Sequence, residues 1–459
     1  MSKNSAGRRE IKYEAHKFVF DRYQNPADAD QIVSLLRKCY DTFRKYDLTV
    51  DKWFELISTD SGVKPENAFV VRLRGSGRIV SHVHIAIRQI LLSNGKFAKM
   101  AGVGNVCTDP DFQGMGLSSK LIGFAHDWLI KKEGIALAAL HSGYLSRGHG
   151  LYRRLGYEDV CFYGRTFAIN GFDMKRVLKD ETSKPERKKQ RKIRTKVNGF
   201  RMMDADGVKR LYKKWCSKHA GSAFRSNEYW QRKYFKKNSL SAFFTFPFKS
   251  ENFLVARDER KGTAVGYLES NILNHQECFV RELVLRDDED IETLDGLTLE
   301  TIKLALGRGC SLTTLFLPSN QIPHRSMIRR EFAEFKNDDC FMARVLDFST
   351  LARLLSGKHA LIDDDFALDC GVGVLSVSKN GIELLDDRTE NIVPDCSVSS
   401  ADFLALILGT KSALQIARDG GFSFHEKLSL SKIRKKNLIE SLGKIFYLDS
   451  WLMWPGDHW

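Results

Sequence analysis

The chain has 459 residues, which is too long for one domain, so two or three domains are expected. It contains 72 Lys and Arg against 57 Asp and Glu, and this net charge of +15 raises the question of an anionic partner. No run of eighteen apolar residues occurs and residues 1–10 are polar, which argues against a membrane span or a signal peptide. Nine cysteines are scattered singly, which argues against a disulfide framework or a zinc site and favours the cytoplasm.

The first predicted element is a helix that opens at residues 28–30. The most informative element follows at residues 106–121, where an apolar strand runs into a glycine-containing turn that opens directly onto an amphipathic helix. Backbone N–H groups at a helix start are unpaired, and the helix dipole adds roughly half a positive charge there. Gly114 and Gly116 allow the backbone to approach a phosphate closely. The segment therefore predicts a pyrophosphate-binding turn, although glycine turns before helices also occur for structural reasons.

A second motif lies about thirty-five residues further along the chain. Residues 135–140 predict a buried strand, and the short helix after it carries Tyr152, followed four residues later by Gly156 and then an aromatic residue. Together the two motifs resemble the signatures of the GNAT superfamily of N-acyltransferases. Gln113 and Gly116 match the pattern of its acyl-CoA loop, and Ser118 replaces the last small residue.

The resemblance implies a direct transfer from acetyl-CoA, without a metal. It makes Tyr152 the general acid toward the sulfur of departing CoA; the alternative is that Tyr152 only packs against the sheet. Cys107 is an alternative covalent nucleophile, but no partner for it can be identified in the sequence, and buried strand cysteines are usually inert. The residues expected to contact the cofactor are Val106, Cys107, Thr108, Gln113, Gly114, Met115, Gly116, Leu117, Ser118, Ser119, Arg147 and Gly148.

A basic segment follows the second motif. Residues 175–196 contain eleven Lys or Arg and three acidic residues, a net charge of +8, and the core of the segment has no aromatic side chain. Such a segment cannot bury itself, so a solvated linker between domains is the simplest interpretation. An electrostatic arm for nucleic acid or an anionic surface is the alternative, with salt-dependent affinity.

The chain after this linker contains a faint repeat of the chain before it. Residues 28–30, Asp-Ala-Asp, recur at 204–206, an offset of 176, and each copy opens a helical segment. The same offset places an apolar strand at about 279–285, after hairpin-like segments at 253–256 and 265–268.

The predicted chemistry is missing from this second copy. Gln113, Gly114 and Gly116 map to Glu289, Asp290 and Glu292, inside the acidic run 287–292, which would repel a pyrophosphate. Tyr152 maps to Ile328, which has no proton to donate. We therefore expect the second copy to be a scaffold without cofactor.

The remaining chain predicts a third domain. It shows a closing strand at 341–347, a helix at 351–355, strands at 361–369 and 373–379, and helices at 400–408 and 411–418. This order resembles a sterol-carrier-like α+β domain, and the whole chain resembles the Eis (enhanced intracellular survival) family of N-acetyltransferases. We therefore expect an α/β protein with mixed sheets: a catalytic GNAT domain at 1–174, the linker at 175–196, a degenerate copy at 197–345 and the sterol-carrier-like domain at 346–459.

The C-terminal tail has its own chemistry. The last fifteen residues contain no Lys or Arg but include Asp449, Asp457 and three tryptophans, a set that could hold an ammonium group. Filling a groove between domains is the alternative role. In the resembled family the terminal carboxylate enters the first active site as the base, which implies that role for Trp459, although that family usually ends in Phe. A carboxyl of pKa about 3.5 could act as a base only if burial raised its pKa.

The sequence thus predicts an N-acetyltransferase that transfers acetyl from acetyl-CoA to a cationic primary amine: an aminoglycoside, a polyamine or a lysine side chain. A longer acyl-CoA donor is a further possibility, and the family resemblance implies a homo-oligomer. The alternative is a non-catalytic module that binds lipid through the third domain or nucleic acid through residues 175–196.

Overall fold

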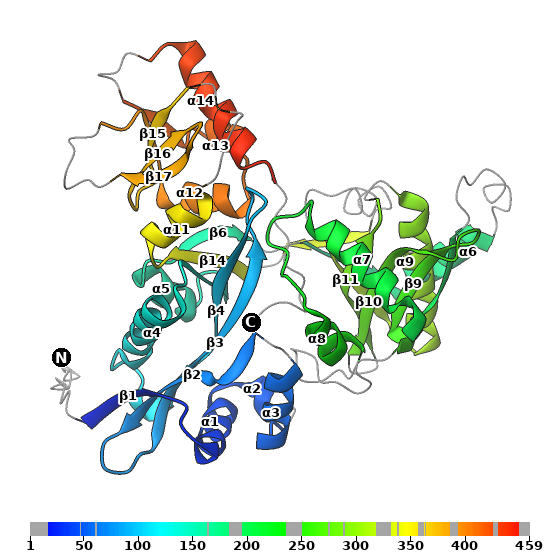
Figure 1. Cartoon of the computed structure of the whole chain (residues 1–459). Coiled ribbons are helices and arrows are strands. Elements are labelled where there is room, and N and C mark those ends of the chain that lie inside the picture. Colours follow the sequence, from blue (N-terminus) through cyan, green and yellow to red (C-terminus); the bar gives the residue numbers. More distant parts are fainter. Residues whose placement is uncertain are drawn as a thin grey trace, which may run out of the picture.

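The structure is a computed structural model of the chain. It describes residues 17–45, 47–59, 62–162, 165–182, 195–235, 250–273, 276–287, 290–317, 332–336, 339–356, 362, 364–385, 393–425 and 430–448. Within these ranges the elements gather into three units, each built on its own sheet (Figure 1). This mixed α/β architecture confirms the expected fold class.

The first unit is built on a mixed sheet that has seven strands within the described ranges. In spatial order they are β1 (Phe18–Arg22), β2 (Val63–Leu73), β3 (Ile79–Leu91), β4 (Phe97–Thr108), β5 (Leu137–Gly143), β14 (Asp339–Val345) and β6 (Glu158–Phe162). The helices that cover it are α1 (Pro26–Cys39), α2 (Asp41–Lys45) and α3 (Val50–Thr59) on one face, and α4 (Leu117–Trp128) and α5 (Arg147–Arg154) on the other. Successive side chains of β2 point to opposite faces of the sheet, so this strand contributes to the hydrophobic core on each face. Ala68 and Val70 pack toward α1, and Phe69 and Val71 pack toward α4.

The second unit repeats this plan. Its strands, in spatial order, are β8 (Thr195–Gly199), β9 (Phe253–Asp258), β10 (Ala264–Leu273), β11 (Glu277–Leu285), β12 (Leu312–Leu317), β7 (Arg165–Asn170) and β13 (Ala333–Lys336). The helices packed with it include α6 (Gly171–Thr182), α7 (Ala205–Cys216), α8 (Asn227–Tyr229) and α9 (Ile291–Gly307). In each unit one central pair of strands is parallel, β4 with β5 and β11 with β12. The order of strands therefore supports the repeat inferred at an offset of 176.

The two units exchange one strand each. β14 comes from the chain after the second unit, yet it lies between β5 and β6 and pairs antiparallel with both (Figure 1). Reciprocally, β7 follows the first unit in sequence but lies between β12 and β13 in the second sheet. Each sheet thus depends on the other half of the chain for its penultimate strand.

This exchange changes the expected domain boundaries. The closing strand predicted at 341–347 is present as β14, but it belongs to the first sheet, so neither 174 nor 345 separates two independent sheets. The expected linker is also shorter than predicted, because residues 175–182 continue α6, whose Met174 is buried in the core of the second unit. Only the pairing of distant strands decides these points. Residues 183–194, the rest of that linker, lie outside the described residues.

The third unit is a sheet whose strands, in spatial order, are β17 (Gly381–Leu385), β16 (Val374–Ser378), β15 (Phe366–Asp369), β18 (Cys396–Val398) and β19 (Phe422–Phe424). Its helices within the described part are α11 (Phe348–Leu355), α12 (Ser400–Leu408), α13 (Ala413–Arg418) and α14 (Lys432–Ile445), and α12 matches its predicted range. α12 docks on the first unit, where Ser93 Oγ donates to the Leu406 carbonyl at 2.6 Å and Ser400 Oγ donates to Glu158 at 3.0 Å. Among the described helices, none combines the length and apolar character needed to cross a bilayer.

Candidate functional site

β4 and β5 run parallel for only a short distance and then diverge. They pair at Met100–Gly102 with Leu137–Ala139, whereas β4 continues to Thr108. A bulge in β4 accompanies the divergence, because its register with β3 shifts near His84 and Asn105 adopts a positive φ of 52°. The divergence leaves main-chain groups of β4 without a neighbouring strand on the β5 side, which opens the sheet at the end of β4.

A cavity of about 400 Å³ lies at this opening. It is lined by all of the predicted cofactor-contacting residues except Met115, together with Tyr152. Met115 is partly buried and packs against the core beneath α4. The lining residues that sequence reasoning missed are Cys39, Tyr40, Phe112, Leu151 and Arg154. The two sequence motifs, separated along the chain, therefore meet in one cavity.

The start of α4 is open to a ligand. Gly116 occupies the N-cap in the left-handed region at φ 70°, and no side chain caps the helix. By contrast, Asn25 caps α1 by accepting a hydrogen bond from the Ala27 N–H. The turn before α4 is held in place by Ser118, whose Oγ lies 2.7 Å from Thr108 Oγ1. The N–H groups of the first turn of α4 are thus available to an anion such as a pyrophosphate.

Side chains fix the end of β4 from three directions. Tyr40 donates its hydroxyl to the Val106 carbonyl at 2.6 Å, and Ser81 Oγ donates to the Cys107 carbonyl at 3.0 Å. Gln113 Nε2 donates to the Thr108 carbonyl at 3.2 Å. Tyr40 could not be found from sequence, because its role depends on the packing of the α1 end against β4.

Tyr152 is buried in the cavity wall and remains protonated. Its side chain is about nine-tenths buried, and that burial raises the pKa of its phenol to about 12. Its ring packs at 6.0 Å from the ring of Tyr157. Gly148 lies one turn earlier, and a Cβ there would contact the Tyr152 ring at 3.6 Å. The phenol is therefore a proton-bearing hydrogen-bond donor across the physiological pH range.

Cys107 has the properties of a buried structural thiol. It is hydrogen-bonded to Cys39, and this contact together with burial raises the pKa of the Cys107 thiol well above its ordinary value. A nucleophilic cysteine needs the opposite shift, toward the thiolate. None of the nine cysteines of the chain is in a disulfide.

At the equivalent place in the second unit, the described residues differ from those that line the cavity. Asp290 caps α9 by accepting from the Thr293 N–H, so the helix start that corresponds to the open start of α4 is closed by a carboxylate. At an offset of 176, Glu282 corresponds to Val106, and it forms a buried bidentate pair with Arg225 at 2.9 and 2.7 Å. The guanidinium of Arg225 lies 3.9 Å from the ring of Tyr212. These contacts support the expectation that the second unit is a scaffold. Glu289 and Ile328 lie outside the described residues, as does the tail from 449 to Trp459.

Comparison with known proteins agrees with this geometry. Residues 22–160 match the family model described as an acetyltransferase (GNAT) domain. Over 133 residues the chain is 30% identical to an uncharacterized N-acetyltransferase, MJ1207, of Methanocaldococcus jannaschii; the match covers 29% of this chain and 57% of that relative, less than two thirds of its length. Residues 22–160, which hold both sequence motifs, are thus similar to a GNAT acetyltransferase domain.

Similar solved structures extend over nearly the whole chain. A probable N-acyltransferase from Enterococcus faecalis V583 superposes with a TM-score of 0.63 at 14% identity, covering 90% of this chain and 95% of that one. A GCN5-related N-acetyltransferase from Anabaena variabilis gives 0.60 at 14% identity, covering 94% and 97%. Eis1 from Mycobacterium abscessus gives 0.58 at 14% identity, covering 96% and 100%. At 14% identity, the similarity to these structures shows a shared fold only.

Proposed function

We propose that the chain is an N-acyltransferase that transfers an acetyl group from acetyl-CoA to the primary amine of a cationic acceptor. The observation that carries this proposal is the cavity at the divergence of β4 and β5. It combines a helix start without a side-chain cap, suited to a pyrophosphate, with the protonated phenol of Tyr152. The pyrophosphate of CoA would bind at the first turn of α4, and the pantetheine arm would follow the exposed main chain of β4.

In this reaction the acceptor nitrogen attacks the thioester carbonyl carbon, the carbon–sulfur bond breaks, and CoA leaves as a thiolate. Tyr152 stabilises that thiolate by donating a hydrogen bond. Complete proton transfer is unfavourable, because a phenol of pKa about 12 is a weaker acid than an ordinary thiol of pKa about 8.5. The difference of about 3.5 units corresponds to roughly 5 kcal/mol. The thiolate therefore takes its proton from solvent, and the attacking nitrogen must lose one to a base.

The acceptor and the base are inferred from the sequence of the tail. Asp449, Asp457 and the carboxylate of Trp459 stand among three tryptophans in a chain of net charge +15, a set suited to holding an ammonium group. We assign the Trp459 carboxylate to orient the amine and to accept its proton, directly or through water. Aminoglycosides, polyamines and lysine side chains are the acceptor classes with matching charge.

The test is amine-dependent release of CoA thiol by the purified chain, with acyl-CoA donors of increasing length against a panel of these amines. Tyr152→Phe and a chain lacking Trp459 are compared with Tyr447→Phe, an exposed tyrosine of the C-terminal region that serves as a matched control. We expect both test variants to lose at least about tenfold in rate, some 1.4 kcal/mol of barrier, and Tyr447→Phe to keep full activity.

The outcomes separate the parts of the proposal. Loss in Tyr152→Phe alone would retain the transferase and remove the terminal carboxylate from its mechanism. Full activity in Tyr152→Phe would contradict the role of the phenol. Absence of thiol release with every donor and amine would overturn the proposed function as a whole.

Direct transfer also predicts the behaviour of Cys107. If the amine attacks acetyl-CoA itself, Cys107→Ala should keep activity within a few-fold, and initial rates should require a ternary complex. Ping-pong kinetics with an acetylated enzyme trapped at Cys107 would instead establish a covalent route.

A further inference from the structure

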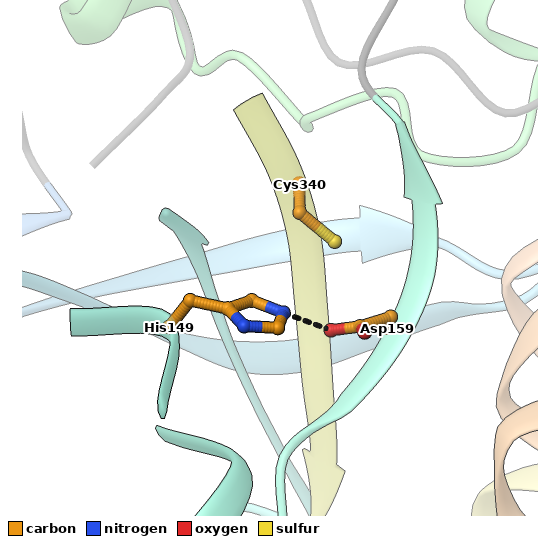
Figure 2. A group of neighbouring side chains, drawn as sticks. All are labelled: His149, Asp159 and Cys340. Atoms are coloured by element: carbon orange, nitrogen blue, oxygen red, sulfur yellow. Dashed lines mark hydrogen bonds and ion pairs between the residues drawn. The ribbon is translucent and has the colours of Figure 1, made fainter. Parts of the chain in front are cut away.

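Three side chains that can ligate a metal converge at α5, the helix that carries Tyr152 (Figure 2). They are His149 of α5, Asp159 of β6 and Cys340 of β14. His149 Nε2 lies 2.8 Å from an Asp159 carboxylate oxygen, and the three potential ligand atoms all lie within 4.8 Å of one another. None of the three lines the cavity described above. The cluster is therefore separate from the proposed acyl-CoA site.

The surroundings of the cluster combine burial with one open side. Cys340 is fully buried and His149 is about 7% exposed, whereas the Asp159 side chain is about one-third exposed. The ring of Tyr144 packs edge-on against the His149 ring at 5.1 Å and against the Phe162 ring at 4.9 Å. An ion among the three side chains would thus be sheltered by protein, with room for water at the Asp159 side.

We propose that His149, Asp159 and Cys340 bind a divalent transition-metal ion, with Zn²⁺ as the best match and a water as the fourth ligand. A neutral imidazole, a carboxylate and a thiolate are all common zinc ligands. Their two negative charges equal the charge of the ion, so the assembled site is neutral, which suits its partly buried position. Alkaline-earth ions, which prefer oxygen ligands only, are disfavoured by the sulfur and nitrogen.

Binding must displace a proton from sulfur. An ordinary thiol has a pKa of about 8.5, so a cysteine without a bound metal carries its proton at neutral pH. The S–H bond breaks, the proton leaves to solvent, and the sulfur electron pair forms the bond to the ion. Affinity should therefore fall as the pH is lowered.

The position of this site gives it a structural consequence. β14 is the strand that the first sheet receives from the chain after the second unit, whereas α5 also carries Tyr152 one turn after His149. An ion bound by residues of α5, β6 and β14 would link the exchanged strand β14 to α5, the helix that carries Tyr152. This inference does not depend on the acetyl-transfer reaction.

The experiment titrates the metal-free full chain with Co²⁺, which replaces zinc and reports its ligands by absorption. We expect one equivalent to bind, with a near-ultraviolet thiolate-to-cobalt band and visible bands of a tetrahedral ion, and Zn²⁺ to abolish both. Cys340→Ser should lose the thiolate band, and Asp159→Asn should weaken binding at least tenfold. Cys161→Ser is the matched control, because Cys161 lies two residues from Asp159 in β6 but outside the cluster, and it should bind as the native chain does.

Thermal unfolding supplies a second readout. Zn²⁺ should raise the midpoint of the native chain and of Cys161→Ser, but not that of Asp159→Asn. If Cys340→Ser does not fold, the comparison between Asp159→Asn and Cys161→Ser decides. A native chain without a thiolate band, or a band that survives Cys340→Ser, would overturn the assignment and leave a hydrogen-bonded trio centred on Asp159.

Discussion

Arg147 Nη1 donates a hydrogen bond to Gln113 Oε1 at 3.2 Å, although the two residues are 34 positions apart. Gln113 belongs to the turn before α4, and Arg147 is the first residue of α5. The contact therefore joins the two sequence motifs at the mouth of the cavity. Under the proposed function, it also places a guanidinium near the phosphates of a bound CoA.

Removing this guanidinium should weaken the binding of acyl-CoA. In Arg147→Ala we expect KM for acyl-CoA to rise about tenfold, because a charge-assisted contact is worth roughly 1.5 kcal/mol. kcat should change little, and the difference from the native enzyme should shrink as salt is raised. Lys131→Ala, which removes an exposed positive charge from the same domain, is the control. An equal rise in KM in that variant would mean that only overall charge matters.

Two glycines of the first domain form a matched pair for testing the turn. Gly114 has φ +81° and Gly123 lies within α4, and a Cβ added at either position would meet nothing within 4 Å. Gly114→Ala should lower stability by about 1 to 2 kcal/mol through the left-handed backbone, and it should raise KM for acyl-CoA. Gly123→Ala should stabilise the helix by up to about 1 kcal/mol. Thermal unfolding and initial rates check both, and equal effects of the two substitutions would contradict the assigned turn.

Buried histidines should make the fold sensitive to mild acid. Burial lowers the pKa of His82 and of His126 to about 3. The unfolded chain therefore binds protons below pH 6.5 that the folded chain does not, so stability is present above pH 6.5 and is lost as the pH falls toward 3. At pH 5 each of these two histidines should lower the free energy of unfolding by about 2 kcal/mol.

The measurement is the unfolding midpoint between pH 7.5 and pH 5. The midpoint of the native chain should fall over this range, and that of His126→Gln should fall less steeply. The carboxylate of Asp28 is paired with Arg72, and its pKa is lowered from 3.8. Its contribution to the stability of the fold is therefore lost only below pH 3.8. A midpoint independent of pH down to 5 would be inconsistent with neutral buried histidines.

The strand exchange predicts that the first domain cannot fold alone. β14 pairs with β5 from Asp339–Gly143 to Val345–Leu137, and its other edge pairs with β6. A chain of residues 1–182 lacks this strand, so we expect aggregation or loss of near-ultraviolet circular dichroism. Co-expression with residues 195–459 as a second chain should restore a soluble one-to-one complex. A folded monomer of residues 1–182 would show that β14 is dispensable.

The sequence by itself determined the parts of the site that are local. The turn at Gly114 and Gly116, the open start of α4 and the position of Tyr152 on α5 depend on residues within one turn or one helix of each other, so motif and spacing were sufficient. The helix at 400–408 follows for the same reason, because its backbone conformation and its capping contacts are specified by a few neighbouring residues.

Only the tertiary structure decided what depends on distant segments. The place of β14 beside β5, the contact of Tyr40 with Val106 and the grouping of His149, Asp159 and Cys340 join residues from 10 to about 200 positions apart. An apolar strand such as β14 can pair with any open sheet edge of suitable register, because the backbone N–H and C=O groups that form the pairing are the same in every sequence. Which edge it joins is set by the packing of the whole chain, and that choice also decided which side chains meet beside α5.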